Sequence, residues 1–156
     1  MDRDTTLLNY ASNPHIAKDA FTLMCGNMLG RGDYRDVFIY NLNPKWVVKV
    51  QRDSAEFSNI LEFEIWCFVK GTEFEKYFAP CYWMSPGGRI LLQHRTDPIT
   101  SKKKPPELIP HFFTDVKDSN FGFIGKRFVA HDYDFTFGKS LKSGLTKRMK
   151  KYKPHM

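Results

Sequence analysis

The 156-residue chain has few cysteines, no long apolar run and no acidic residue after Asp134. Its three cysteines are odd in number and none belongs to a C-x-x-C pair, which argues against a disulfide framework and a zinc ribbon. No stretch approaches the roughly 18 apolar residues of a transmembrane helix, and residues 1–20 lack the apolar core of a signal peptide. These absences lead us to expect a cytoplasmic, single-domain protein without a membrane partner.

The chain does contain many aromatic side chains and a localised positive charge. Aromatic residues make up 15% of the sequence and hydrophobic residues 42%, enough for a folded core. The seven Lys and Arg residues of segment 139–156 account for the whole net charge of +7. A basic tail of this kind binds phosphates, anionic lipid or an acidic protein, or it is the solvated end of a helix. Nucleic-acid binding ranks last, because the neutral body lacks the aromatic and basic stripe of such proteins.

The pattern of apolar and turn residues predicts an α+β chain made mostly of antiparallel strands. The expected elements, in chain order, are a helix over 14–23, strands around 37–40 and 46–50, a helix from Asp53 or Ser54 to about Lys70, a hairpin over 80–93, a proline- and lysine-rich linker over 97–110, a hairpin over 121–130 and a short basic helix near the C-terminus. The core face of the second helix is expected to consist of apolar residues at helical spacing, namely Phe57, Leu61, Ile65 and Phe68.

Three polar features stand out against this background, and each has an ordinary explanation when taken alone. Lys49 interrupts an apolar strand, where an ammonium group is costly unless it has a partner or reaches water at a sheet edge. The segment 115–120 is compatible with a plain turn, and Asp132 with the cap of a strand end. Their order along the chain favours a shared function.

This order resembles the protein-kinase-like fold: a glycine-rich turn, a strand with one lysine, a helix with a glutamate, a hairpin, an Asp-x-Lys-x-x-Asn segment and a strand that ends in Asp. Residues 29–37 resemble the glycine-rich loop, although Arg35 stands at its third glycine position. Val47-Val48-Lys49 resembles the strand that carries the kinase lysine. The segment 115–120 matches the catalytic loop, and Asp132-Tyr133-Asp134 stands where kinases carry Asp-Phe-Gly.

The resemblance covers about residues 28–138 and is greatest to the small, divergent serine/threonine-kinase-like proteins that bacteriophages encode. It implies one kinase-like domain of class α+β, with an antiparallel N-lobe sheet, one αC-type helix and a minimal C-terminal lobe. The chain then divides into a helical extension (1–27), an N-lobe (28–96), a hinge linker with the catalytic-loop hairpin (97–138) and a basic tail (139–156).

The resemblance assigns ATP-binding roles to six residues: Gly30, Gly32, Val37, Lys49, Glu62 and Gln93. Glycines let phosphate oxygens approach backbone N–H groups closely. Lys49 is expected to contact the α- and β-phosphates and to be held by a helix carboxylate, either Glu62 or Glu64. We choose Glu62, because the residues that follow it match those that follow the glutamate of the family. Gln93 stands in the hairpin that resembles the hinge against which adenine stacks.

The resemblance likewise assigns catalytic roles to Asp115, Lys117, Asn120 and Asp132. Asp115 is expected to orient the attacking hydroxyl or accept its proton, and Lys117 to lie next to the transferring phosphate. Asn120 and Asp132 are expected to hold Mg²⁺, a cation that prefers oxygen ligands. The implied cofactors are therefore ATP and Mg²⁺.

The chain also departs from the family in ways that bear on function. Phe113 and Thr114 replace the His-Arg pair of the catalytic loop, and the chain is too short for the large lobe that grips a peptide substrate. Either the protein then uses a reduced surface, or a partner protein or a second copy of the chain completes that lobe. The aromatic residues of this region form either a local core or an interface with a host protein or a second copy: Phe112, Phe113, Phe121, Phe123, Phe128, Phe135 and Phe137.

Two functions therefore stay open. The first is a Mg²⁺- and ATP-dependent phosphotransferase of the serine/threonine kinase type, encoded by a phage and acting on host proteins in the host cytoplasm. The alternative is a binding protein on a kinase scaffold that inhibits or sequesters a host protein. The four catalytic positions, which all carry the expected residue types, favour the first function. The missing large lobe favours the second.

Overall fold

The computed structural model describes residues 14–52, 57–134 and 145–155. Their helices and strands, in chain order, are α2 (Pro14–Met24), β1 (Cys25–Arg31), β2 (Arg35–Tyr40), β3 (Trp46–Gln51), α3 (Ser58–Val69), the 3-10 helix η1 (Glu75–Tyr77), β4 (Cys81–Met84), β5 (Ile90–His94), β6 (Leu108–Pro110), the 3-10 helix η2 (Asp118–Asn120), β7 (Phe121–Ile124), β8 (Arg127–Ala130) and β9 (Met149–Lys151). The expected caps Asn13, Asp53 and Ser54 lie outside the described residues.

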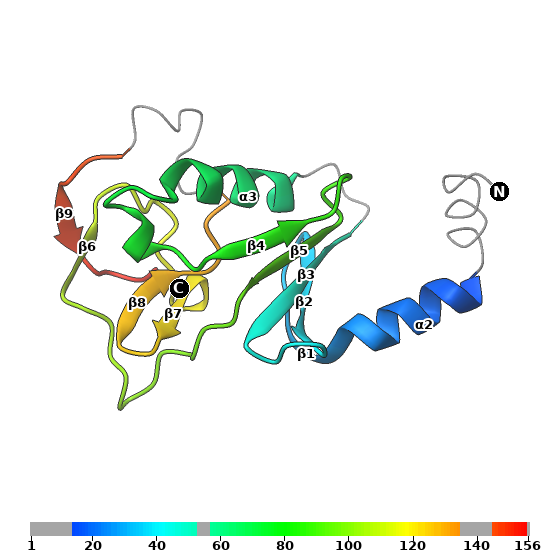
Figure 1. The fold of residues 1–156 in the computed structure, drawn as a ribbon. Helices are drawn as coiled ribbons and strands as arrows, with labels where there is room; N and C mark the ends of the chain where they lie inside the picture. The colour runs from blue at the N-terminus through cyan, green and yellow to red at the C-terminus, as the bar shows by residue number, and fades with distance from the viewer. Residues whose placement is uncertain (1–13, 53–56, 135–144, 156) are drawn as a thin grey trace.

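A five-stranded antiparallel sheet with the strand order β1-β2-β3-β5-β4 forms the larger part of the fold. The helix α3 lies along this sheet, α2 extends from its far edge, and the β7–β8 hairpin lies beyond its other side (Figure 1). The predicted class α+β is confirmed: the described residues form an antiparallel five-stranded sheet, the helix α3 beside it and a second, smaller lobe that contains the short strands β6 to β9.

The two faces of the sheet carry different chemistry, because neighbouring side chains along a strand point to opposite faces. One face is apolar, and Phe38, Val48 and Leu92 pack there with Cys25. Phe21 of α2 meets the ring of Phe38 on this face at 5.2 Å between ring centroids. The other face faces α3 and carries buried polar side chains, namely Lys49, Gln51 and Gln93. Lys49, which interrupts an apolar strand in the sequence, is therefore one of several buried polar side chains on this face.

The buried face of α3 is not the one that its apolar residues predict. Phe57 is 65% exposed and Leu61 is 36% exposed, whereas Ile65 is buried. The residues of α3 that do face the protein are Ser58, Asn59, Glu62, Ile65, Trp66 and Val69. Half of this stripe is polar because it meets the polar face of the sheet, so the apolar periodicity led to the wrong face. The predicted end of the helix is correct, since α3 stops at Val69 and Gly71 follows with a φ of +79°.

The short second lobe has an aromatic core that it shares with α3. Phe78 is fully buried at its centre. Its ring lies 5.9 Å from Phe112, 5.3 Å from Phe113 and 5.0 Å from Tyr133, measured between ring centroids. Ile65, Trp66 and Val69 of α3 belong to the same cluster.

This packing favours the local-core interpretation of the aromatic residues over an interface. Phe112, Phe113, Phe121 and Phe123 are buried and Phe128 is partly buried, while Phe135 and Phe137 lie outside the described residues.

The C-terminal tail corrects two predictions. The linker 97–110 ends in the strand β6, and residues expected to form a basic helix instead form β9, which pairs with β6 through Leu108↔Lys151 and Pro110↔Met149. Tyr152 explains the placement, because its ring packs on Phe121 and Phe128 at centroid distances of 5.9 and 5.6 Å. A pairing between segments about 40 residues apart leaves no local periodicity for sequence analysis to detect.

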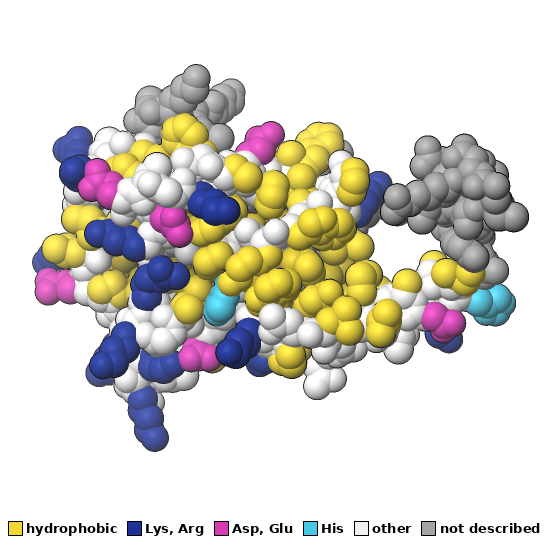
Figure 2. Space-filling model, in the orientation of Figure 1, with side chains coloured by type: hydrophobic (Ala, Val, Ile, Leu, Met, Phe, Trp, Pro, Cys, Tyr) yellow, Lys and Arg dark blue, Asp and Glu magenta, His cyan; other side chains and the backbone are white. Residues whose placement is uncertain are grey.

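The surface separates apolar from basic side chains. On the face shown in Figure 2, hydrophobic side chains gather over the sheet and α2, and Lys and Arg side chains gather over the part that contains β6 to β9. Large exposed apolar residues include Phe21 of α2, Leu29 of β1 and Trp83 of β4. Among the described residues, no helix has the length and apolar character needed to cross a membrane.

The orientation of α3 yields a direct test by paired substitutions. Ile65→Ala removes a buried side chain and should lower the free energy of unfolding by about 2–5 kcal/mol, whereas Leu61→Ala should cost about 1 kcal/mol or less. Denaturant unfolding of the two variants measures the difference. Equal losses would contradict the orientation of the helix described here.

Candidate functional site

A buried lysine–glutamate ion pair joins β3 to α3. Lys49 Nζ lies 2.5 Å from Glu62 Oε1 and also donates to the backbone carbonyl of His131. Both side chains are buried, so Lys49 does not reach water at a sheet edge. Glu64 is exposed, which resolves the choice between the two glutamates in favour of Glu62. The predicted pairing of a strand lysine with a helix carboxylate is thus present.

Glu62 receives donors on both of its oxygens. Besides Lys49, Gln93 Nε2 donates to Oε1 at 3.1 Å, and the backbone N–H of Tyr133 donates to Oε2 at 3.0 Å. A buried carboxylate is tolerated when its lone pairs are satisfied in this way. Gln93 is fully buried behind the ion pair, so its side chain supports Glu62, and this position does not fit the adenine contact that sequence analysis assigned to it.

Arg35 brings a second cation into the same site. From the first position of β2, its Nη2 donates to Glu62 Oε2 at 3.2 Å and to Asp132 Oδ1, and it lies 3.9 Å from Asp134 Oδ1. Its Nη1 donates to Asn59 Oδ1 at 3.3 Å. The arginine noted in sequence analysis as a departure from the glycine-rich loop is therefore a site residue.

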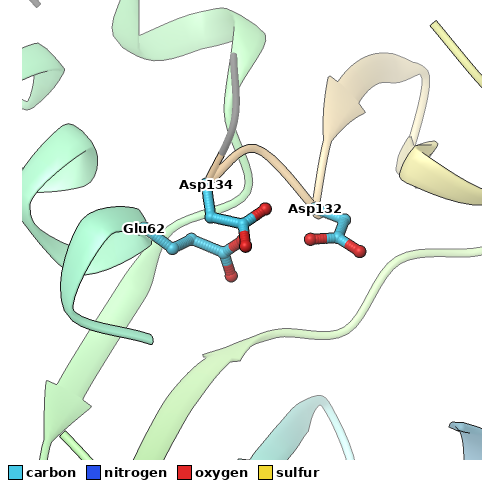
Figure 3. Close-up of side chains that lie close together, drawn as sticks. All are labelled: Glu62, Asp132 and Asp134. Carbon is cyan, nitrogen blue, oxygen red and sulfur yellow. The ribbon is translucent and has the colours of Figure 1, made fainter. Parts of the chain in front are cut away.

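Three carboxylates converge on this guanidinium. Glu62, Asp132 and Asp134 each offer an oxygen within 4.8 Å of the others, and Figure 3 shows Glu62 on α3 facing the segment that follows β8. Burial raises the pKa of Asp132, but the charges of Arg35, Lys49 and His131 outweigh it and bring the pKa down to about 2. For Asp134, burial and the charges of Asp132 and Glu62 outweigh the attraction of Arg35 and raise the pKa to about 6.

The predicted catalytic loop places Asp115, Lys117 and Asn120 together. The short helix η2 turns the chain back, so that Asn120 Nδ2 donates to Asp115 Oδ2 at 2.9 Å. Lys117 Nζ lies 3.3 Å from Asp115 Oδ1. The backbone carbonyl of Asn120 accepts from the N–H of Asp132 at 3.2 Å, which fixes this loop beside Asp132. The four predicted catalytic residues therefore form one continuous group.

The C-terminal tail lies against this loop and contributes a histidine to it. His155 Nε2 lies 3.2 Å from Asp115 Oδ1, and the His155 N–H donates to the carbonyl of Val116 at 2.9 Å. Burial acts to raise the pKa of Asp115, but hydrogen bonds from His155, Asn120 and Lys117 outweigh it and lower the pKa. Sequence analysis gave no role to His155, because its partner lies 40 residues earlier in the chain.

The glycine-rich turn continues the site across the sheet. Gly30 pairs with Val37, and Val37 pairs with Lys49, so these three predicted residues occupy one row across β1, β2 and β3. The N–H of Gly32 donates to the carbonyl of Arg35 at 2.8 Å and closes the turn. A Cβ placed on Gly30 meets no atom within 4 Å, so internal packing does not require a glycine there. Close approach of a ligand to the backbone is a remaining reason for one.

The predicted Mg²⁺ ligands do not fit a metal ion in this arrangement. Oxygen donors such as those of Asp132 and Asn120 are the type that Mg²⁺ prefers. However, the guanidinium of Arg35 binds Asp132 Oδ1 at the point where Asp132, Glu62 and Asp134 meet, and its positive charge opposes a second cation there. Asp132 meets Glu62 and Asp134 around a cation that the chain itself supplies.

The likenesses to known proteins are distant. No family model matches the chain, and no curated protein matches it significantly. The chain is similar to solved structures of a streptomycin–ATP–APH(2″)-IIa ternary complex and a gentamicin–APH(2″)-IIa complex, each with 24% identity, a TM-score of 0.40, and coverage of 58% of this chain and 31% of the other. An ADP-bound aminoglycoside phosphotransferase, APH(2″)-Ib, has 23% identity, the same coverages and a TM-score of 0.41. The chain spans about a third of the length of these proteins, and similarity at this level carries no argument about its activity.

The ion pair predicts a large difference between two neighbouring glutamates. Glu62→Gln leaves Lys49 and Arg35 buried without their shared carboxylate and should cost about 3–5 kcal/mol of unfolding free energy. Glu64→Gln changes the same charge on the exposed face and should stay within about 0.5 kcal/mol of the wild type. Denaturant unfolding compares the two, and a cost below about 1 kcal/mol for Glu62→Gln would contradict a stabilising role for the pair.

Proposed function

We propose that the chain is an ATP-dependent phosphotransferase of the serine/threonine protein kinase type. The observation that carries this proposal is the buried Lys49–Glu62 pair, which lies in the same row of the sheet as Val37 and Gly30. A lysine held by a carboxylate at the inner face of the sheet suits the binding of phosphate oxygens, because the carboxylate fixes the position of the ammonium group. The open space above Gly30 lets those oxygens approach the backbone.

The catalytic loop supplies the groups that act on the acceptor. Asp115 accepts the proton of the attacking hydroxyl as the bond from oxygen to phosphorus forms and the bond to the leaving diphosphate breaks. Lys117, next to Asp115, stabilises negative charge on the transferring phosphoryl group. Asn120 orients Asp115 by donating to its carboxylate. We further propose that the chain is phage-encoded and acts on host proteins in the host cytoplasm, with a partner or a second copy providing the surface that its short second lobe lacks.

A second candidate is a binding protein on the kinase scaffold. Two contacts favour it: Asp132 is held by Arg35, and Asp115 is held by His155. The carboxylates of Asp132 and Asp115, both of which sequence analysis assigned to catalysis, are thus already bound by other residues of the chain. In this candidate function the scaffold inhibits or sequesters a host protein without transferring phosphate.

Nucleotide binding is tested first by thermal unfolding. ATP at a hundred times its dissociation constant should stabilise the wild type by about 2.7 kcal/mol, which raises Tm by roughly 5–10 °C. Gly30→Ala should weaken this effect at least tenfold in ATP concentration, because the new Cβ stands where the phosphates approach. Gly87→Ala is the matched control, since its Cβ also meets no atom within 4 Å and lies on another loop. No shift with ATP, in EDTA or in Mg²⁺, would overturn the phosphotransferase proposal and leave the binding protein.

Transfer itself separates the two candidate functions. With radiolabelled ATP and a host-cell extract, the wild type should label protein, and Asp115→Asn should lower the rate about 100-fold or more while keeping the ATP-induced rise in Tm. Asp97→Asn, an exposed aspartate paired with Lys103, should transfer at the wild-type rate. Binding of ATP without any labelling would contradict the phosphotransferase and favour the scaffold function.

A further inference from the structure

The guanidinium of Arg35 occupies the point where three carboxylates meet. It donates to Glu62 and Asp132 and lies 3.9 Å from Asp134, and its side chain is 7% exposed. Asn59 accepts from its other terminal nitrogen and in turn donates to the backbone carbonyls of Lys49 and Gly88, so the guanidinium is held in a fixed orientation. Arg35 is therefore a buried cation with several fixed partners, unlike a surface ion pair.

The carboxylates need a cation whether or not a metal is present. The three side chains lie close together (Figure 3), with oxygens within 4.8 Å of one another. Among the three, Lys49 forms an ion pair with Glu62. Like charges this close and this buried are unstable unless a positive group lies between them. Arg35 supplies that group, and because a guanidinium keeps its charge at every pH that a protein tolerates, it leaves only by moving.

We propose that Arg35 is an internal cation that occupies the divalent-metal position at Asp132, so that Arg35 and a metal ion exclude one another there. A Mg²⁺ ion bound at about 2.0–2.1 Å to the oxygens where the three carboxylates meet would need the space, and the lone pair of Asp132 Oδ1, that Arg35 uses. The two cations therefore compete for Asp132, and metal binding requires the arginine side chain to leave Glu62, Asp132 and Asn59 together. The inference concerns the same site as the proposed function, but it holds whether or not the chain binds ATP.

The test uses a metal alone, so its outcome is independent of nucleotide binding. Binding of Mn²⁺ is measured by electron paramagnetic resonance of the free ion, in the absence of ATP. The wild type and Asp132→Asn should bind Mn²⁺ equally weakly, since Arg35 occupies the point where the carboxylates meet in the wild type, and the variant lacks the Asp132 carboxylate. Arg35→Gln should bind one Mn²⁺ at least tenfold more tightly than the wild type, and the double variant Arg35→Gln/Asp132→Asn should lose that gain.

Two further variants serve as controls for charge and for folding. Arg31→Gln removes the same charge from an exposed arginine on the neighbouring strand, paired with Asp36, and should leave Mn²⁺ binding unchanged. Arg35→Gln/Asp134→Asn removes one cation and one carboxylate, which keeps the charge of the cluster constant if Arg35→Gln alone folds poorly. Thermal unfolding gives a second readout: Mn²⁺ or Mg²⁺ should raise the Tm of both Arg35→Gln variants and not that of the wild type.

Each result decides the proposal. Tight binding of Mn²⁺ by the wild type that Asp132→Asn abolishes would overturn it, because metal and arginine would then coexist. Folded Arg35→Gln variants that gain no metal affinity would overturn it as well. If neither variant folds even with the metal, a divalent ion does not replace the guanidinium and the proposal is wrong; if the metal restores folding, it is supported.

Discussion

The structure depends on balancing buried charge at the inner face of the sheet. Two cations, Lys49 and Arg35, share the carboxylate of Glu62, and Asp132 and Asp134 complete the cluster. Removing one partner from a buried group of this kind costs about 3–5 kcal/mol, a large part of the stability of a small domain. Elements far apart in sequence must therefore meet with correct geometry: β2, β3, α3 and the segment after β8. The same requirement that stabilises the fold also assembles the candidate site.

The second lobe shares its core with α3. Phe78 follows η1 and is fully buried against Phe112, Phe113 and Tyr133, and α3 covers the same cluster. The tail then adds β9, whose neighbour Tyr152 covers Phe121 and Phe128. Aromatic rings bury much area per residue and pack edge to face, which suits a core made from few residues. Segment 115–120 lies between these aromatic residues in the sequence, and Phe113 and Phe121 on either side of it belong to the core cluster.

Sequence analysis predicted what local patterns encode and missed what distant contacts decide. The strands β2, β3, β4, β5, β7 and β8 follow from apolar runs between turns and the end of α3 from a glycine stop, while the Lys49–Glu62 pair followed from the family resemblance. The buried face of α3 was predicted wrongly, because Asn59 and Glu62 are buried by polar partners rather than by their own hydrophobicity. Sequence analysis did not identify Arg35 as a site residue, since its partners lie 24, 27 and 97 residues away in the sequence. The one signal in the sequence was that Arg35, a charged residue, stands where the family has a glycine.

The carboxylates of Asp115 and Asp132 are each bound by a cation of the chain, and the two contacts differ in strength. Asp115 and His155 are 36% and 54% exposed, and an ion pair in such a position contributes about 1 kcal/mol or less. The side-chain contact between His155 and Asp115 is thus the weaker of the two. Arg35 is buried and donates to Glu62, Asp132 and Asn59, so releasing it breaks several hydrogen bonds at once. Because the Lys49–Glu62 pair is complete while Arg35 binds Asp132, different contacts hold the two parts of the candidate site, and Arg35 fixes the position of the carboxylates after β8.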